Sequence, residues 1–215
     1  MRDIVAIIGS HPDTRGEFDF GRTDCDVWVF NEVVSNGDWC PRADVVFQLH
    51  KPPSWRIPGS SHYQWLKTTD TLVYMIEQYE DVPAAVKYPL DEVLALTPGY
   101  VFLTSSVAHA IGLAIVQGYK RIEIYGVEME TSTEYVHQQP GVAFWVGFGL
   151  GRGIEVVHHT KKFYTQPIYG FEGSHTITIE QLKKRESELV DKVPLYRELF
   201  QEALNAIEKA LITFG

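Results

Sequence analysis

Small and polar residues stand in short stretches that each follow a run of apolar residues. These residues are Gly9, Ser10, His11, Asn31, His50, Thr104, Ser105, Ser106, Gly126 and Glu128. Glycine lets a backbone approach a ligand closely, and hydroxyl and amide side chains both donate and accept hydrogen bonds. Imidazole is the commonest general base near neutral pH. Together these types could bind the base, ribose and phosphate of a nucleotide, and His50 could accept a proton.

The turn from Gly9 to Thr14 lacks the signatures of the common phosphate-binding loops. It has neither the G-x-G-x-x-G pattern of dinucleotide-binding proteins nor the G-x-x-x-x-G-K-[ST] pattern of P-loop proteins. The chain also has no H-E-x-x-H, G-x-S-x-G or C-x-x-C sequence, which excludes zincins, the common serine hydrolases and thioredoxin-like redox proteins. We expect backbone N–H groups and small polar side chains of this turn to contact a mononucleotide, with a purely structural turn as the alternative.

Acidic and polar residues are dense between positions 128 and 138. Glu128 and Glu130 would point to the same side if the preceding strand continues. Two carboxylates could hold Mg²⁺ or act as a base, and a solvated loop gives the same pattern. The residues beyond them, Ser132, Tyr135 and Gln138, suit a loop that faces a substrate. Mg²⁺ is the one cofactor that these residues leave open.

Six apolar runs predict the strands that must position these groups. They span residues 4–8, 26–30, 44–49, 100–103, 121–125 and 154–157. Continuous apolar runs are typical of parallel strands that are buried on both faces. In open α/β sheets, ligands bind beyond the carboxyl ends of the strands, and this is where each polar stretch falls. The sequence therefore predicts a Rossmann-like α/β fold, with a mostly parallel sheet of about six strands flanked by helices.

Helices are expected between these strands. Residues 105–117 form the clearest one, because Ser105 or Ser106 can cap it, alanines favour it and Gly118 ends it. Residues 65–79 are expected to be partly helical, and residues 142–149 to form a helix before the last strand.

After Gly173 the strand-like apolar runs give way to apolar residues at helical spacing. We therefore expect a domain over residues 1–173 and a helical tail over residues 174–215. Thr178 and Gln181 form a capping-box pattern, and Pro194 should kink or divide the tail. A packed tail and an oligomerisation element both fit its apolar stripe. The stripe comprises Leu182, Leu189, Val193, Tyr196, Phe200, Leu204, Ile207 and Leu211.

Composition restricts the partners of the chain. Its 215 residues carry a formal charge of −9, which disfavours general binding to nucleic acid. The two cysteines, Cys25 and Cys40, fit unpaired thiols in a reducing compartment. No apolar run is long enough to span a bilayer, and the first residues do not resemble a signal peptide. The expected location is the cytoplasm.

Long stretches of the sequence resemble a family of uncharacterised Rossmann-like proteins of bacteriophages, for which the cytoplasm would be that of the host. The resemblance covers roughly residues 3–172 and includes the segments IVAIIGSHPDTRGEFDF, CDVWVFNEV, ADVVFQLH and FLTSSVAHAIGLAIVQGYKRIEIYGVEM. More distantly, the layout is similar to that of the Cst-type bacterial sialyltransferases and of the pterin pyrophosphokinase-like family. The sialyltransferase elements that surround a CMP-sugar match Gly9-Ser10, Asn31, the Thr104 turn and the segment from Gly118 to Glu128. The first turn departs from that pattern, because Ser10-His11-Pro12 replaces Asn-Gly-Pro.

This resemblance and the polar stretches favour a glycosyltransferase-like enzyme that uses a nucleotide-activated sugar. His50 or His137 would deprotonate the acceptor, and Glu128 would orient sugar or acceptor hydroxyls. Two alternatives remain open. One is a Mg²⁺-dependent pyrophosphoryl or phosphoryl transferase that uses Glu128 and Glu130. The other is a non-catalytic, nucleotide-binding accessory protein that oligomerises through its tail.

Overall fold

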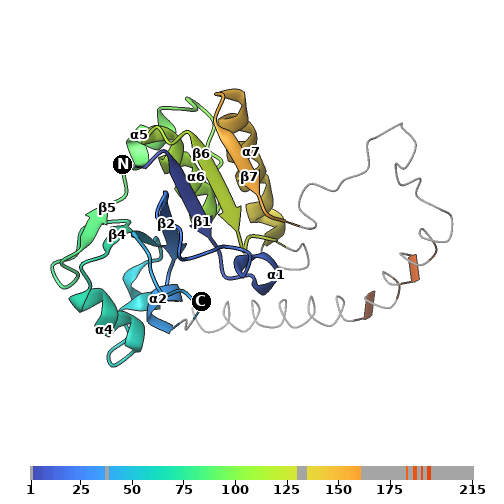
Figure 1. The fold of residues 1–215 in the computed structure, drawn as a ribbon. Coiled ribbons are helices and arrows are strands. Elements are labelled where there is room, and N and C mark those ends of the chain that lie inside the picture. The colour runs from blue at the N-terminus through green and yellow to red at the C-terminus, as the bar shows by residue number, and fades with distance from the viewer. Residues whose placement is uncertain are drawn as a thin grey trace. The chain divides into compact units, whose positions relative to one another are not determined.

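A seven-stranded, fully parallel sheet forms the centre of the structure (Figure 1). The computed structural model describes residues 2–36, 39–129 and 135–160, together with six helical positions between 183 and 194. The order of the strands is β5-β4-β3-β2-β1-β6-β7. The strands are β1 (Ile4–Ile8), β2 (Cys25–Phe30), β3 (Val45–Gln48), β4 (Leu72–Met75), β5 (Ala85–Lys87), β6 (Arg121–Tyr125) and β7 (Glu155–His158).

Helices cover both faces of the sheet, as the continuous apolar runs predict. On β1, Val5 and Ile7 belong to one buried cluster, whereas Ala6 and Ile8 belong to the other. The first cluster includes side chains of α5 (Leu90–Leu94), α6 (Ser106–Val116) and α7 (Tyr135–Gly151). The opposite face carries α2 (Val33–Asn36), α3 (Pro52–Trp55) and α4 (Ser61–Thr68), whose side chains pack with the second cluster.

The path of the chain creates a switch point between β1 and β6. From β1 the chain adds β2 to β5 on one side of the sheet, and it then returns through α6 to place β6 on the other side of β1. In open α/β sheets, ligands bind at such a switch point, beyond the carboxyl ends of the strands. The short helix α1 (Pro12–Arg15) lies in the loop that leaves β1 at this point (Figure 1).

Helix α6 brings the Thr104-Ser105-Ser106 turn to the same edge of the sheet. The side chain of Ser105 caps α6 by accepting a hydrogen bond from the backbone N–H of Ala108, at 3.2 Å. Only Gln117 to Lys120 separate the end of α6 from β6, so α6 ends at the amino edge of the sheet and begins at the carboxyl edge. Buried alanines at 108, 110 and 114 let α6 pack closely against the sheet, as its composition predicts.

One expected strand is absent from the structure. Residues 100–103 form no strand: Tyr100 and Val101 are 66% and 70% exposed, and the Phe102 ring stacks on Phe144 at 4.2 Å. An apolar run of four residues looks the same whether it enters a sheet or packs on a helix. The segment 65–79 is partly helical, as expected, because it contains the end of α4, but it also contains all of β4, which the sequence does not predict. The real strands β4 and β5 contain only four and three residues, too few for a clear pattern.

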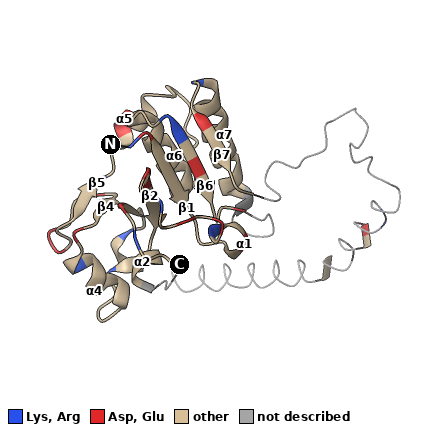
Figure 2. Ribbon diagram, in the orientation of Figure 1, with Lys and Arg blue, Asp and Glu red and all other residues tan. Residues whose placement is uncertain are grey.

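A buried carboxylate ties the loop after α1 to the middle of β6. Glu123 is 2% exposed, and its oxygens accept hydrogen bonds from Arg22 Nη1 at 2.6 Å and Arg121 Nε at 2.7 Å. The hydroxyl of Tyr125 donates a third, at 3.0 Å. Burial disfavours the ionised form, but these hydrogen bonds outweigh it and lower the pKa of Glu123. Figure 2 shows the basic and acidic residues of β6 side by side on the strand.

The chain divides into two compact units, Met1–Thr165 and Gln166–Gly215. The six helical positions belong to the second unit and include Val193 and Pro194. The domain boundary at residue 173, the capping box of Thr178 and Gln181, and the rest of the apolar stripe lie outside the described residues. The helical tail and its role in oligomerisation therefore stay predictions.

Candidate nucleotide-binding crevice

The loops that leave β1 and β6 touch backbone to backbone. Gly9 N–H donates to the Tyr125 carbonyl at 2.8 Å, and His11 N–H donates to the Gly126 carbonyl at 3.0 Å. A Cβ atom on Gly9 would lie 2.3 Å from the Gly126 oxygen, and one on Gly126 would lie 2.4 Å from the Gly9 oxygen. Gly126 also has a φ of +63°, a conformation that side chains disfavour. Both glycines are therefore required for this contact at the floor of the crevice.

Glu128 braces the same two loops. This carboxylate is 3% exposed, and its two oxygens accept hydrogen bonds from the Thr14 hydroxyl at 3.2 Å and the Thr160 hydroxyl at 2.8 Å. The Thr14 oxygen in turn accepts the N–H of Gly126 at 2.9 Å. Thr14 comes from α1 and Thr160 follows β7, so Glu128 links three segments. Through these hydrogen bonds Glu128 holds the three segments together.

Replacing Thr14 by valine should destabilise this brace. Valine has the shape of threonine but cannot accept the Gly126 N–H or donate to Glu128, which leaves two buried polar groups each short of a hydrogen bond. Each such loss costs about 1–3 kcal/mol, so we expect the free energy of unfolding to fall by about 2–4 kcal/mol. Thr14→Ser keeps the hydroxyl and should lose less than about half of that. Urea unfolding followed by circular dichroism measures the difference, and equal losses in both variants would contradict the bridging role.

Asn31 lies at the carboxyl end of β2 in a conformation that few residues adopt. Its φ is +52°, a left-handed value that asparagine tolerates better than most side chains. Its backbone N–H donates to the Phe47 carbonyl at 2.9 Å, which fixes the residue between β2 and β3. The side-chain Oδ1 is buried and has no hydrogen-bond partner among the described residues. Buried oxygens are rarely left unpaired, so this atom is a candidate acceptor for a ligand donor.

The first turn of α7 lies next to the Thr104 turn. The Thr104 hydroxyl donates to the Gln138 carbonyl at 3.0 Å, which joins the segment before α6 to the start of α7. His137 is the residue before Gln138, and its side chain is exposed. The structure therefore brings His137 close in space to Thr104, Ser105 and Ser106, from which it is more than thirty positions away in the sequence.

The other predicted histidines lie elsewhere on this edge. His50 follows β3 and is exposed, and the strand order puts β3 two positions from β1, roughly 10 Å away. His11 is half-buried, and its Nδ1 accepts the N–H of Asp13 at 3.4 Å, so the ring caps α1. Ser10 is exposed beside it. Glu130 and Ser132 lie outside the described residues, and Tyr135 begins α7.

The end of β7 contributes groups that sequence reasoning did not single out. His158 Nε2 lies 2.7 Å from the Val127 carbonyl, and burial lowers the pKa of this histidine. The His159 ring stacks on Tyr125 with 4.0 Å between the ring centres. Thr160 donates to Glu128, as described above. Their position after the last apolar run is the only signal that the sequence offers for them.

The described residues form neither a metal-binding cluster nor a membrane-spanning helix. Among them, no group of three or more His, Cys, Asp or Glu side chains is arranged to hold a metal ion. Within the same part of the chain, no helix has the length and apolar character needed to cross a membrane.

Comparison with known proteins finds a similar fold but no similar sequence. No protein-family model matches the chain, and no curated protein is significantly similar to it. The sialyltransferase CstII from Campylobacter jejuni, solved with the substrate analogue CMP-3FNeuAc, matches with a TM-score of 0.51 and 14% identity over 72% of this chain and 79% of that one. The same enzyme solved with cytidine-5'-monophosphate matches with a TM-score of 0.50 and 16% identity over 74% and 79%. This likeness confirms the Rossmann-like fold and its layout. The phage and pterin pyrophosphokinase-like resemblances stay predictions.

Proposed function

We propose that this protein is a glycosyltransferase that uses a nucleotide-activated sugar. The observation that carries the proposal is the carboxyl edge of the sheet at the switch point between β1 and β6. Gly9 and Gly126 touch there, and the buried Oδ1 of Asn31, after the neighbouring strand, has no hydrogen-bond partner among the described residues. A fold of the same layout belongs to CstII, which was solved with CMP and with a CMP-sugar analogue. The likeness in fold alone does not assign an activity, so the proposal depends on the groups present at this edge.

The nucleotide would lie over the two glycine-containing loops. The Ser10 hydroxyl and the His11 ring, which lie beside the contact between Gly9 and Gly126, would donate hydrogen bonds to its phosphate. The Asn31 Oδ1 would accept a hydrogen bond from the base or the ribose. The hydroxyls of the Thr104-Ser105-Ser106 turn would bind the ribose or the sugar, together with the start of α7, from Tyr135 to Gln138.

Transfer of the sugar needs a base for the acceptor hydroxyl. We assign this role to His137, because its side chain is exposed and the next residue, Gln138, is hydrogen-bonded to Thr104. The imidazole would take the acceptor proton while the acceptor oxygen bonds to the anomeric carbon and the bond from that carbon to the nucleotide breaks. Glu128 would act by holding the loops that bind the nucleotide. His50 remains the second candidate for the base.

A thermal-shift panel tests whether the crevice binds nucleotides. We expect one family among CMP, UDP, GDP and ATP, or its sugar conjugate, to raise the unfolding temperature by several degrees at a concentration of about 100 Kd, which corresponds to about 2.7 kcal/mol. Asn31→Ala should remove most of that rise. The matched control is Gln78→Ala, which also truncates an amide side chain but lies on an exposed loop after β4. A panel in which no nucleotide stabilises the wild-type chain would exclude the proposal.

The phosphoryl-transfer alternative gains no support from the described residues. Both oxygens of Glu128 already accept hydrogen bonds, and Glu130 lies outside the described residues. Adding EDTA to the same panel separates the two functions. Stabilisation by ATP that EDTA abolishes would favour the Mg²⁺-dependent transferase, and stabilisation by a nucleotide sugar that EDTA leaves unchanged would favour the glycosyltransferase.

A further inference from the structure

Most arginines of the described part of the chain are paired with carboxylates. Arg2 pairs with Asp26, Arg22 and Arg121 pair with Glu123, and Arg56 pairs with Asp81, with N–O distances of 2.6–2.7 Å. The exceptions among the described residues are Arg15, Arg42 and Arg152, which take part in none of these ion pairs. Of the three, Arg15 is the one that belongs to α1, in the loop that leaves β1 at the crevice. An unpaired guanidinium at this place, in a chain with a formal charge of −9, needs an explanation.

The Arg15 side chain is held in place by two contacts. Its Nη1 donates to the Ser10 carbonyl at 2.8 Å, and its guanidinium carbon lies 4.5 Å from the centre of the Trp39 ring. Arg15 is the basic residue in the last turn of α1, the short helix that follows the first turn (Figure 2). A guanidinium has five N–H donors, and the others have no acceptor among the described residues. The side chain is half-buried, so these donors are fixed in position and still accessible.

Arg15 begins next to the contact between Gly9 and Gly126. Its Cβ atom lies only 3.0 Å from the position that a Cβ atom on Gly126 would take, so the side chain starts beside the floor of the site. The neighbouring His11 accepts the Asp13 N–H with Nδ1, which leaves Nε2 to carry the proton of the neutral ring as a second donor. The nearest carboxylates in the sequence, Asp13 and Glu17, are exposed, and Glu17 lies 3.3 Å from His159 Nδ1.

We propose that Arg15 binds the phosphate of the ligand at this crevice. The Arg15 guanidinium and the His11 Nε2–H would donate to the phosphate oxygens above the Gly9–Gly126 contact. A guanidinium matches a phosphate in geometry because it can donate two parallel hydrogen bonds. This inference rests on the proposed function for the identity of the ligand as a nucleotide, and it adds which side chain recognises the phosphate.

A structural role is the competing explanation for Arg15. The hydrogen bond to Ser10 and the contact with Trp39 could simply brace the first turn. A brace would affect binding of a nucleoside and a nucleotide equally, since both need the turn to be in place. A phosphate ligand would affect only the nucleotide, so comparing the two ligands separates the explanations.

Calorimetry on the full chain provides the test, with CMP, UDP, GDP and ATP, the nucleoside of each, and pyrophosphate as probes. In Arg15→Gln, we expect the preference for a nucleotide over its nucleoside to fall by a factor of about 10 to 100, as expected for a lost charged hydrogen bond. Nucleoside affinity should change less than about twofold, and added salt should weaken CMP binding less than in the wild type. Arg15→Lys keeps the charge, so its preference for a nucleotide over the nucleoside should lie between those of the wild type and Arg15→Gln.

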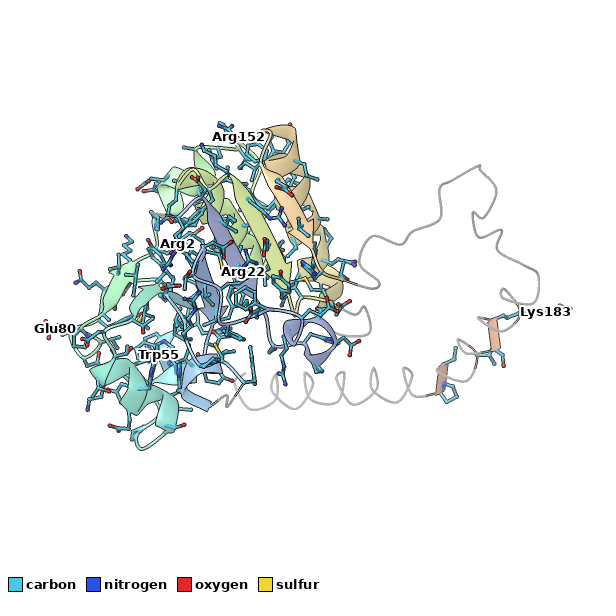
Figure 3. All side chains as sticks on the ribbon, in the orientation of Figure 1. Arg2, Arg22, Trp55, Glu80, Arg152 and Lys183 are labelled. Atoms are coloured by element: carbon cyan, nitrogen blue, oxygen red, sulfur yellow. The ribbon has the colours of Figure 1, made fainter. Side chains whose placement is uncertain are left out.

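Arg152→Gln is the matched control. Arg152 also lacks a carboxylate partner among the described residues and also lies over an aromatic ring, that of Phe148, at 5.4 Å. It follows α7 at the end of the sheet away from α1 (Figure 3), and its replacement should leave every affinity unchanged.

The outcomes distinguish the inference from the proposed function. Suppose that nucleotides bind, and that Arg15→Gln weakens the binding of nucleotide and nucleoside equally or weakens neither. Arg15 is then not the phosphate ligand, and the proposed function stands. If no nucleotide or nucleoside binds but pyrophosphate binds in an Arg15-dependent way, the phosphate site stands and the proposed function is wrong. If the wild-type chain binds none of the probes, both are wrong.

Discussion

Replacing His137 by glutamine should lower the rate of sugar transfer by a factor of about 100 to 10,000, the range typical of a lost general base. Glutamine keeps the polarity and approximate size of the side chain but cannot accept a proton at neutral pH. The affinity for the nucleotide should change little, because the Ser10, His11 and Asn31 groups that would hold it lie on other elements. The loss should therefore appear in kcat rather than in the Kd of CMP.

His50→Gln is the control that makes this result specific. Both histidines are exposed at the carboxyl edge of the sheet, but only His137 adjoins in sequence a residue, Gln138, that is hydrogen-bonded to the Thr104 turn. We expect His50→Gln to lower kcat by less than about tenfold, in assays that follow release of the free nucleotide from its sugar conjugate. A larger loss with His50→Gln than with His137→Gln would move the base to the end of β3 and would contradict the role assigned to His137.

The parts of the fold that the sequence predicts are those in which burial sets the residue types. The strands β1, β2 and β3 are apolar over almost their whole length because side chains on both of their faces enter buried clusters. The strand-end rule then places Gly9, Asn31 and Gly126 at one edge, without any motif. The strands β4 and β5 escaped prediction because they are short and one side of β5 is open, with Val86 44% exposed.

The parts of the site that the sequence does not predict depend on contacts between distant positions. Thr14, Glu128 and Thr160 become one hydrogen-bonded group only when α1, β6 and β7 are brought together. Nothing about threonine in isolation distinguishes such a residue from a solvated one. The same holds for Arg15, whose lack of an ion pair with the described residues is a property of its surroundings in space rather than of its neighbours in the chain. Geometry is required to recognise these residues.

Gly9→Ala should have the largest effect on stability of all these substitutions. A methyl group at this position would lie 2.3 Å from the Gly126 oxygen and 2.9 Å from Val127 Cγ2, well inside van der Waals contact. Backbone atoms on the far side cannot rotate away as a flexible side chain can, so the carboxyl ends of β1 and β6 must separate. That movement strains or breaks the hydrogen bonds of 2.8 Å from Gly9 to Tyr125 and 3.0 Å from His11 to Gly126.

Overpacking and two weakened hydrogen bonds together should lower the free energy of unfolding by about 3–5 kcal/mol, a large fraction of the roughly 5–15 kcal/mol typical of a domain. Gly16→Ala is the matched control, because Gly16 has an ordinary φ of −71° and a methyl group there would meet no atom within 4 Å. It should leave stability unchanged or raise it by up to about 1 kcal/mol, since alanine restricts the unfolded chain. Urea unfolding of both variants measures the difference. If the free energy of unfolding of Gly9→Ala lies within about 1 kcal/mol of the wild-type value, the two loops can separate freely. The proposed site would then lack the rigid contact on which nucleotide binding depends.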